Sequence, residues 1–166
     1  MKKRFMKPII FFTLFVVTLF SCNKSSSSVA DGTKKGILHF GNQTEPEDLD
    51  PHIVTGVPEY HILQALFEGL VSPDPVDLHP IPGAARSWDI SDNHLTYTFH
   101  LRSDGRWSNG DPVKAGDFVF SFKRILSPAL GAEYAYMLYC IDKAEEYHKG
   151  ILKDFDKVGV KASNDT

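Results

Sequence analysis

Histidines are the side chains in this sequence best suited to bind a metal or move a proton, and they are scattered along the chain, at positions 39, 52, 61, 79, 94, 100 and 148. No two of them have the His-x-x-x-His spacing that puts two ligands on one helix face, and none forms a zinc-type spacing with Cys22 or Cys140. The sequence also lacks a Gly-x-Ser-x-Gly nucleophile elbow and a phosphate-binding glycine loop. We therefore expect no metal, no cofactor and no enzymatic activity.

Acidic side chains crowd one short stretch of the chain: Glu45, Glu47, Asp48 and Asp50. Two neighbouring carboxylates can act as a catalytic acid and base. Pro46, Pro51 and Pro58 punctuate the same stretch, however, and prolines with acidic and glycine neighbours are typical of a loop. The sequence favours a solvated loop over residues 42–58, and a loop of this length is usually functional.

The N-terminal residues indicate export. Residues 1–7 carry four basic side chains and no acid, and residues 8–20 are almost wholly apolar, which is typical of a secretory signal peptide. The apolar run is shorter than the roughly 20 residues that a membrane-spanning helix needs. Leu19, Ser21 and Cys22 resemble the lipobox of bacterial lipoproteins, although Phe20 is bulkier than the residue usual there. The resemblance implies cleavage after a signal peptide of residues 1–21 and lipid on Cys22.

A tether follows the expected lipid attachment site. Residues 23–28 are Asn, Lys and four serines, a polar composition that does not build a core. We expect residues 22–35 to hold a folded domain away from the membrane, and the acyl chains on Cys22 to anchor it. The expected location is the periplasm or cell envelope.

Composition indicates one modest folded domain. The chain has 166 residues, of which 42% are hydrophobic and 12% aromatic, enough for a real core. Its net charge of −3 provides no basic patch, so we expect no nucleic-acid partner. If Cys22 carries lipid, Cys140 has no disulfide partner, and its apolar neighbours favour a buried, inert thiol.

Helical and strand patterns are mixed along the chain. The periodicities predict helices at 59–67, with Gly69 near a left-handed cap, at 115–126 and as two short helices within 133–149. They predict strands at 36–41 and 95–101, a strand beginning in 157–161, an irregular segment at 71–82 and a turn at 108–111. The fold class expected from these elements is α+β, or mixed.

Four segments share their order and spacing with one protein family. They read TEPEDLDPH at 44–52 with TGVPE at 55–59, LFEGL at 66–70, HPIPGAARSW at 79–88, and YTFHLR at 97–102 followed by RWSNGDPV at 106–113 and KR at 123–124. Together they resemble the N-terminal part of the periplasmic oligopeptide-binding proteins of ABC importers, within family 5 of the bacterial extracellular solute-binding proteins.

The resemblance implies an incomplete, two-lobed periplasmic-binding-protein-like fold. Residues 36–67 would be the first segment of the main lobe and residues 68–166 the smaller lobe. The implied ligand is a short extended peptide whose backbone pairs with the protein, and the implied partners are ABC permease subunits. Thr55, Gly56 and Val57 match the family segment that borders the peptide, and Tyr134 matches an aromatic that lines the cleft. Equally open alternatives are a turn glycine at 56 and core packing for Tyr134.

Other functions remain open beside peptide import. The resemblance also fits a receptor for dipeptides, nickel or haem, and a surface lipoprotein with a structural or adhesive role. Family members are much longer than this chain, so we expect a fragment that binds peptides poorly by itself. Lys114 and Gly116 depart from the family pattern, and because a lysine side chain cannot accept a hydrogen bond, we expect a weak start to the helix at 115–126.

Overall fold

The computed structural model describes residues 28–165, so the signal peptide, Cys22 and most of the serine run lie outside the described residues. The chain divides into two compact units, one up to Gly41 and one from Asn42 onward. In the first unit, α2 (Ser28–Lys34) occupies the second half of the region expected to be a tether. Within the described part of the chain, no helix is both long enough and apolar enough to cross a bilayer.

The expected strand at 36–41 is wrong. Residues 37–41 have no regular secondary structure, and the Ile37 N–H donates to the Gly32 carbonyl oxygen at 2.8 Å instead of to a neighbouring strand. A strand is held by ladder bonds to a partner. Among the described residues no β-bridge joins this segment to another, so its apolar pattern does not become a strand.

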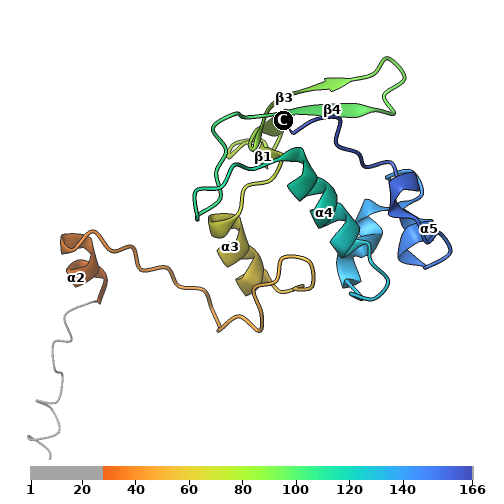
Figure 1. Cartoon of the computed structure of the whole chain (residues 1–166). Helices are drawn as coiled ribbons and strands as arrows, with labels where there is room; N and C mark the ends of the chain where they lie inside the picture. The colour runs from red at the N-terminus through yellow and green to blue at the C-terminus, as the bar shows by residue number, and fades with distance from the viewer. Residues whose placement is uncertain (1–27, 166) are drawn as a thin grey trace, which may run out of the picture. The chain divides into compact units, whose positions relative to one another are not determined.

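The second unit contains two antiparallel hairpins (Figure 1). The first pairs β1 (Val71–Pro73) with β2 (Pro80–Pro82), a segment expected to be irregular because of its prolines. Proline cannot donate to a ladder but is tolerated in a strand with an open edge, and each strand of a two-stranded sheet has one. The second hairpin pairs β4 (Tyr97–Leu101), the predicted strand, with β3 (Ala85–Ile90), which sequence analysis missed.

The turn into β3 depends on a close backbone approach. A Cβ on Gly83 would lie 2.6 Å from the carbonyl oxygen of Gly69, a contact that real side chains do not make. The same Gly69 carbonyl accepts the Ala84 N–H at 2.9 Å, which joins the first hairpin to the second. Gly69 is therefore a packing partner of this turn, and the expected left-handed helix cap there is wrong: the cap of the preceding helix is Phe67, in an extended conformation.

The predicted helices are confirmed with small changes at their ends. They are α3 (Val57–Leu66), α4 (Ala115–Ile125), the 3-10 helix η1 (Glu133–Leu138) and α5 (Ala144–His148). A further 3-10 helix, η2 (Phe155–Lys157), ends at the first residue of the expected final strand. That strand is wrong, because Val158 closes a turn by donating to the Phe155 carbonyl oxygen at 2.8 Å and turns its side chain into the core.

The start of α4 is better held than Lys114 suggests. The Asp117 carboxylate, three residues on, accepts the Lys114 backbone N–H at 2.9 Å and the Trp107 indole N–H at 3.0 Å. The Lys114 ammonium pairs with Asp165 at 2.9 Å, and the Ala115 N–H donates to the Asp165 carbonyl oxygen at 3.1 Å. An acid at the third helical position thus supplies the half of a capping box that lysine cannot.

The hydrophobic core lies among the C-terminal helices. Its buried members are Leu126, Ala132, Ala135, Ala144, Phe155 and Val158, and the apolar side of α4 packs against them. Three alanines in this set allow the short helices to approach closely. Cys140 is not part of it: its thiol is exposed, which corrects the expectation of a buried thiol, because it lies in the turn between η1 and α5.

Candidate peptide-binding site

The site expected from the sequence lies on the loop of residues 42–56, which contains no helix or strand. Two side-chain hydrogen bonds hold the first part of this loop to the first turn of α3. The Asn42 amide donates to the Pro58 carbonyl oxygen at 3.1 Å, and the Glu47 backbone N–H donates to the Glu59 carboxylate at 2.8 Å. Glu59 is only 5% exposed, so its carboxylate sits inside the loop and shapes it.

An open hollow of about 590 Å³ lies between this loop and the start of α3. Its walls come from the loop and from the first residues of the helix, and are Thr44, Glu45, Glu47, Asp48, Ile53, Val54, Thr55, Gly56, Pro58 and Glu59. Two of the predicted binding residues, Thr55 and Gly56, therefore line one cavity. The hollow has the volume range of a small-ligand site.

Tyr134 lies beside the same segment, although 79 residues separate it from Thr55. Its hydroxyl donates to the Thr55 carbonyl oxygen at 3.3 Å. The ring is 44% exposed and stands edge-on to Tyr136, with centroids 6.3 Å apart. Core packing, the alternative for Tyr134, is therefore excluded in this structure.

The segment of Thr55 and Gly56 carries backbone N–H groups without a protein partner among the described residues. Within the described part of the chain, the N–H groups of Thr55 and Gly56 donate to no protein acceptor. Gly56 precedes α3 in an extended conformation, and Val57 is the exposed first residue of the helix. A buried donor without a partner would be costly, but these lie at an open cavity where a ligand can reach them. Whether they bind peptide remains a prediction.

Close packing against Glu59 restricts position 56 to glycine. A Cβ there would lie 1.9 Å from a carboxylate oxygen of Glu59. Because Glu59 is buried and already bonded to Glu47, its side chain has little freedom to move away. Close packing inside the loop therefore requires Gly56, whatever the ligand.

A polar cluster joins the loop to α4. The Arg124 guanidinium makes a bidentate pair with Asp50, with N–O distances of 2.7 and 2.5 Å, and also donates to Nδ1 of His52 at 2.7 Å. The other ring nitrogen of His52 lies 2.8 Å from the Ser121 hydroxyl. Hydrogen bonding from Arg124 lowers the pKa of Asp50 to about 2. Burial and the neighbouring Arg124 charge lower the pKa of His52 below its ordinary value.

Sequence reasoning missed this cluster. Asp50, His52 and Arg124 all belong to the segments that carry the family resemblance, yet nothing in their spacing shows that they meet. Ser121 and Arg124 are one helical turn apart, so both face the same way, and that periodicity was the only available signal.

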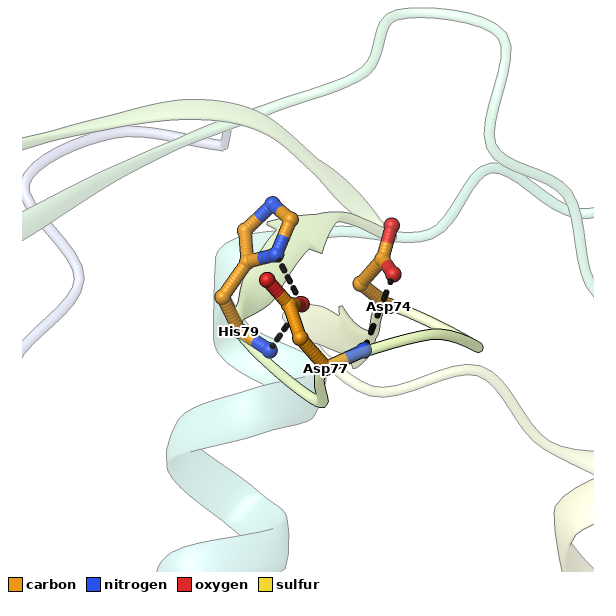
Figure 2. A group of neighbouring side chains, drawn as sticks. All are labelled: Asp74, Asp77 and His79. Carbon is orange, nitrogen blue, oxygen red and sulfur yellow. Dashed lines mark hydrogen bonds and ion pairs between the residues drawn. The ribbon is translucent and has the colours of Figure 1, made fainter.

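A second group of ionisable side chains lies in the loop between β1 and β2 (Figure 2). Asp74, Asp77 and His79 place their ligand-type atoms within 4.8 Å of one another. The Asp77 carboxylate accepts a hydrogen bond from the His79 ring at 2.5 Å, and this bond lowers the pKa of Asp77. Asp74 accepts the Val76 backbone N–H at 2.8 Å. These bonds within an exposed turn account for the arrangement, so we assign the group to turn formation.

Comparison with known proteins decides the family. The model of family 5 of the bacterial extracellular solute-binding proteins, in its middle region, matches residues 79–166. The periplasmic oligopeptide-binding protein OppA of Haemophilus influenzae is 42% identical over 142 residues, which is 82% of this chain. The chain belongs to this family. Another member, the dipeptide-binding protein DppE of Bacillus subtilis, is 37% identical over 86% of the chain.

Solved structures of family members agree with the fold. The crystal structure of Haemophilus influenzae OppA in complex with the peptide RPPGFSPFR matches 75% of the chain with a TM-score of 0.70 and 42% identity. The murein tripeptide-binding protein MppA of Escherichia coli matches 72% with a TM-score of 0.67 and 36% identity. The chain spans about a quarter of these family members: 26% of the first OppA sequence and 24% and 23% of the two structures. The expected mixed, periplasmic-binding-protein-like fold is confirmed.

Proposed function

We propose that this chain contributes to the capture of short peptides by the solute-binding component of an ABC-type oligopeptide importer. The observation that carries the proposal is its 42% identity to a family member whose solved structure holds a peptide. The open hollow beside Thr55 and Gly56, with their unpaired N–H groups, supports a peptide-binding role for this part of the chain.

The chemistry of such a site follows from backbone pairing. Thr55 and Gly56 would donate to carbonyl oxygens of an extended peptide, and these groups are the same in every peptide sequence. Side chains of the peptide would lie in the open hollow, where water can bridge to the acidic groups that line it. Binding of this kind accepts many sequences. It requires no bond to be made or broken, so the proposal is for a binding protein without catalysis.

Location and partners belong to the same proposal. Lipid on Cys22 would hold the protein at the membrane surface, outside the cytoplasm and near permease subunits that receive the peptide. The names of several family members include the word periplasmic, in agreement with export. Radiolabelled palmitate incorporated by the wild-type chain and lost in Cys22→Ala would support the anchor; equal labelling of the two would contradict it.

Peptide titration tests the binding proposal directly. The full chain, ¹⁵N-labelled and kept in a mild detergent because residues 8–20 are apolar, is titrated with trialanine. We expect the amide signals of Thr55, Gly56 and Val57 to shift, with a dissociation constant weaker than micromolar because the chain spans a quarter of its relatives. Free alanine, which has no peptide carbonyl, is the control and should leave them unchanged. Shifts absent at ~10 mM trialanine would contradict the proposal.

A dipeptide receptor is the second candidate, favoured by the 37% identity to the dipeptide-binding protein DppE. Dialanine added to the same sample separates the two. A larger shift at equal concentration with dialanine than with trialanine would favour the second candidate.

A further inference from the structure

The loop that carries the binding segment is fixed to α4 at one place. Asp50 and His52 reach across to Arg124 and Ser121, residues more than 65 positions away in the sequence. The Asp50 side chain is 24% exposed and Arg124 34%, so the bidentate pair is mostly shielded from water. A planar guanidinium on a carboxylate gives an ion pair a defined geometry as well as energy.

Backbone bonds carry this geometry toward the binding segment. The N–H groups of Ile53 and Val54 both donate to the Asp50 carbonyl oxygen at 3.2 Å, and the His52 N–H donates to the Asp50 carboxylate at 3.0 Å. Thr55 follows directly. Fixing Asp50 therefore fixes the turn that leads into Thr55 and Gly56, which line the hollow.

The bonds made by His52 require a neutral ring. Nδ1 accepts from Arg124, so the proton of the neutral imidazole sits on Nε2 and points to Ser121. A protonated imidazole has no acceptor nitrogen and would place a second positive charge beside the guanidinium. Two charged groups face His52: Arg124 from α4, which opposes protonation, and Asp50 from its own loop, which favours it. Ser121 is the remaining contact and does not titrate.

We propose that Arg124 is a positioning residue for the Thr55–Val57 segment, acting through Asp50 and His52, and that protonation of His52 partly releases this segment by breaking the His52–Arg124 bond while the Asp50–Arg124 pair stays in place. The inference deepens the proposed peptide site and rests on it for its purpose, but the movement it describes exists without peptide. Partial release would make the donors less ordered and so weaken peptide capture in acid. The site would then be sensitive to the pH of the compartment that it faces.

A pH titration without peptide tests the release. In the full ¹⁵N-labelled chain in mild detergent, the ring nitrogens of His52 and the amides of Thr55 and Gly56 are followed from pH 7.5 to 4.5. We expect both amides to shift with the same midpoint as the His52 ring, below the ordinary histidine value near 6.5. His52→Asn keeps an acceptor near the Nδ1 position and cannot be protonated in this range, so it should abolish the step. Two results would overturn the proposal: a step that persists in His52→Asn, or amide signals of Thr55 and Gly56 that do not change as the His52 ring titrates.

Substitution of the arginine tests positioning. Arg124→Gln should lower hydrogen-exchange protection at Ile53 and Val54 by about tenfold and alter the His52 midpoint, while Arg124→Lys, which retains one charged donor, should restore part of each. Arg102→Gln is the matched control, because Arg102 pairs with Glu68 at 3.0 Å and with Asp104 at 3.6 Å, neither of which belongs to this loop. Protection unchanged in Arg124→Gln would overturn the proposal. If instead Arg124→Gln unfolds, Ser121→Ala, which removes only one neutral contact, must shift the His52 midpoint.

Trialanine then separates this inference from the proposed function. If peptide binds, the affinity of the wild type should decrease at pH values below the His52 midpoint. The affinity of His52→Asn should not change with pH. A pH-dependent loop that binds no peptide at any pH supports the release but contradicts the binding site. A loop whose amide signals do not change with pH, but which binds peptide, contradicts the release alone.

Discussion

The loop of residues 42–56 and the helical cluster from α4 to η2 hold their shapes by different forces. The cluster buries apolar side chains around Leu126 and Val158, both with no exposed surface. The loop has no buried apolar residue and is held by side-chain hydrogen bonds and one ion pair. The free energy of apolar burial depends little on pH or on the orientation of the groups, whereas the strength of the loop's polar contacts depends on both. The difference teaches that apolar packing stabilises the helical cluster, whereas the proposed binding segment, Thr55–Val57, depends on polar contacts that pH can change.

The largest expected effect comes from the cluster. Leu126→Ala removes a fully buried side chain and leaves a cavity, so it should lower the free energy of unfolding by about 2–4 kcal/mol. Urea unfolding of the full chain followed by circular dichroism measures it. Leu95→Ala, at a residue 82% exposed, is the control and should change little. Equal effects of the two substitutions would show that the cluster is not the core.

A smaller effect is expected from the ion pair of the loop. Asp50→Asn removes the charge that Arg124 faces and should cost about 1–2 kcal/mol near pH 7, a value reduced for partial exposure. Because folding lowers the Asp50 pKa from 3.8 to about 2, this stability is complete above about pH 4 and is lost as pH falls through 2.

Urea unfolding at pH 7, 5 and 3 measures the difference between the wild type and Asp50→Asn. We expect the difference to be nearly the same at pH 7 and pH 5 and smaller at pH 3, which lies between the unfolded and folded pKa values of Asp50. Asp89→Asn is the control, since Asp89 is a carboxylate 78% exposed and paired only at the surface. A difference that stays constant with pH would mean that Asp50 acts through packing and not through its charge, which would weaken the contrast between loop and cluster.

The smallest effect is expected at Tyr134. Tyr134→Phe removes one hydrogen bond to Thr55 from an exposed ring, so the stability should change by no more than about 0.5 kcal/mol. The Gly56 amide signal should shift, because its N–H shares a peptide group with the Thr55 carbonyl. Tyr136→Phe, on the adjoining ring, is the matched control. A Gly56 signal that shifts equally in both variants would rule out a specific contact.

The outcome at particular elements shows where sequence reasoning worked. The helices at 57–66 and 115–125 followed from apolar spacing, because a helix makes its backbone bonds within itself. The strands at 36–41 and 157–161 failed and β1, β2 and β3 were missed, because a strand exists only where another segment supplies its bonds. At the site, the positions of Thr55, Gly56 and Tyr134 came from the family resemblance. Only the fold shows that Tyr134 lies beside Thr55.

The sequence by itself determined the family and the local elements whose hydrogen bonds are internal, and it predicts an export signal before Cys22. Tertiary structure alone decided that Tyr134 reaches Thr55, that Glu59 lies buried beneath the loop, and that Arg124 receives both Asp50 and His52. The physical reason is the range of the contacts. Periodicity reports neighbours three or four residues apart, while a loop without a helix or strand takes part of its shape from side chains that the fold brings from more than 65 residues away.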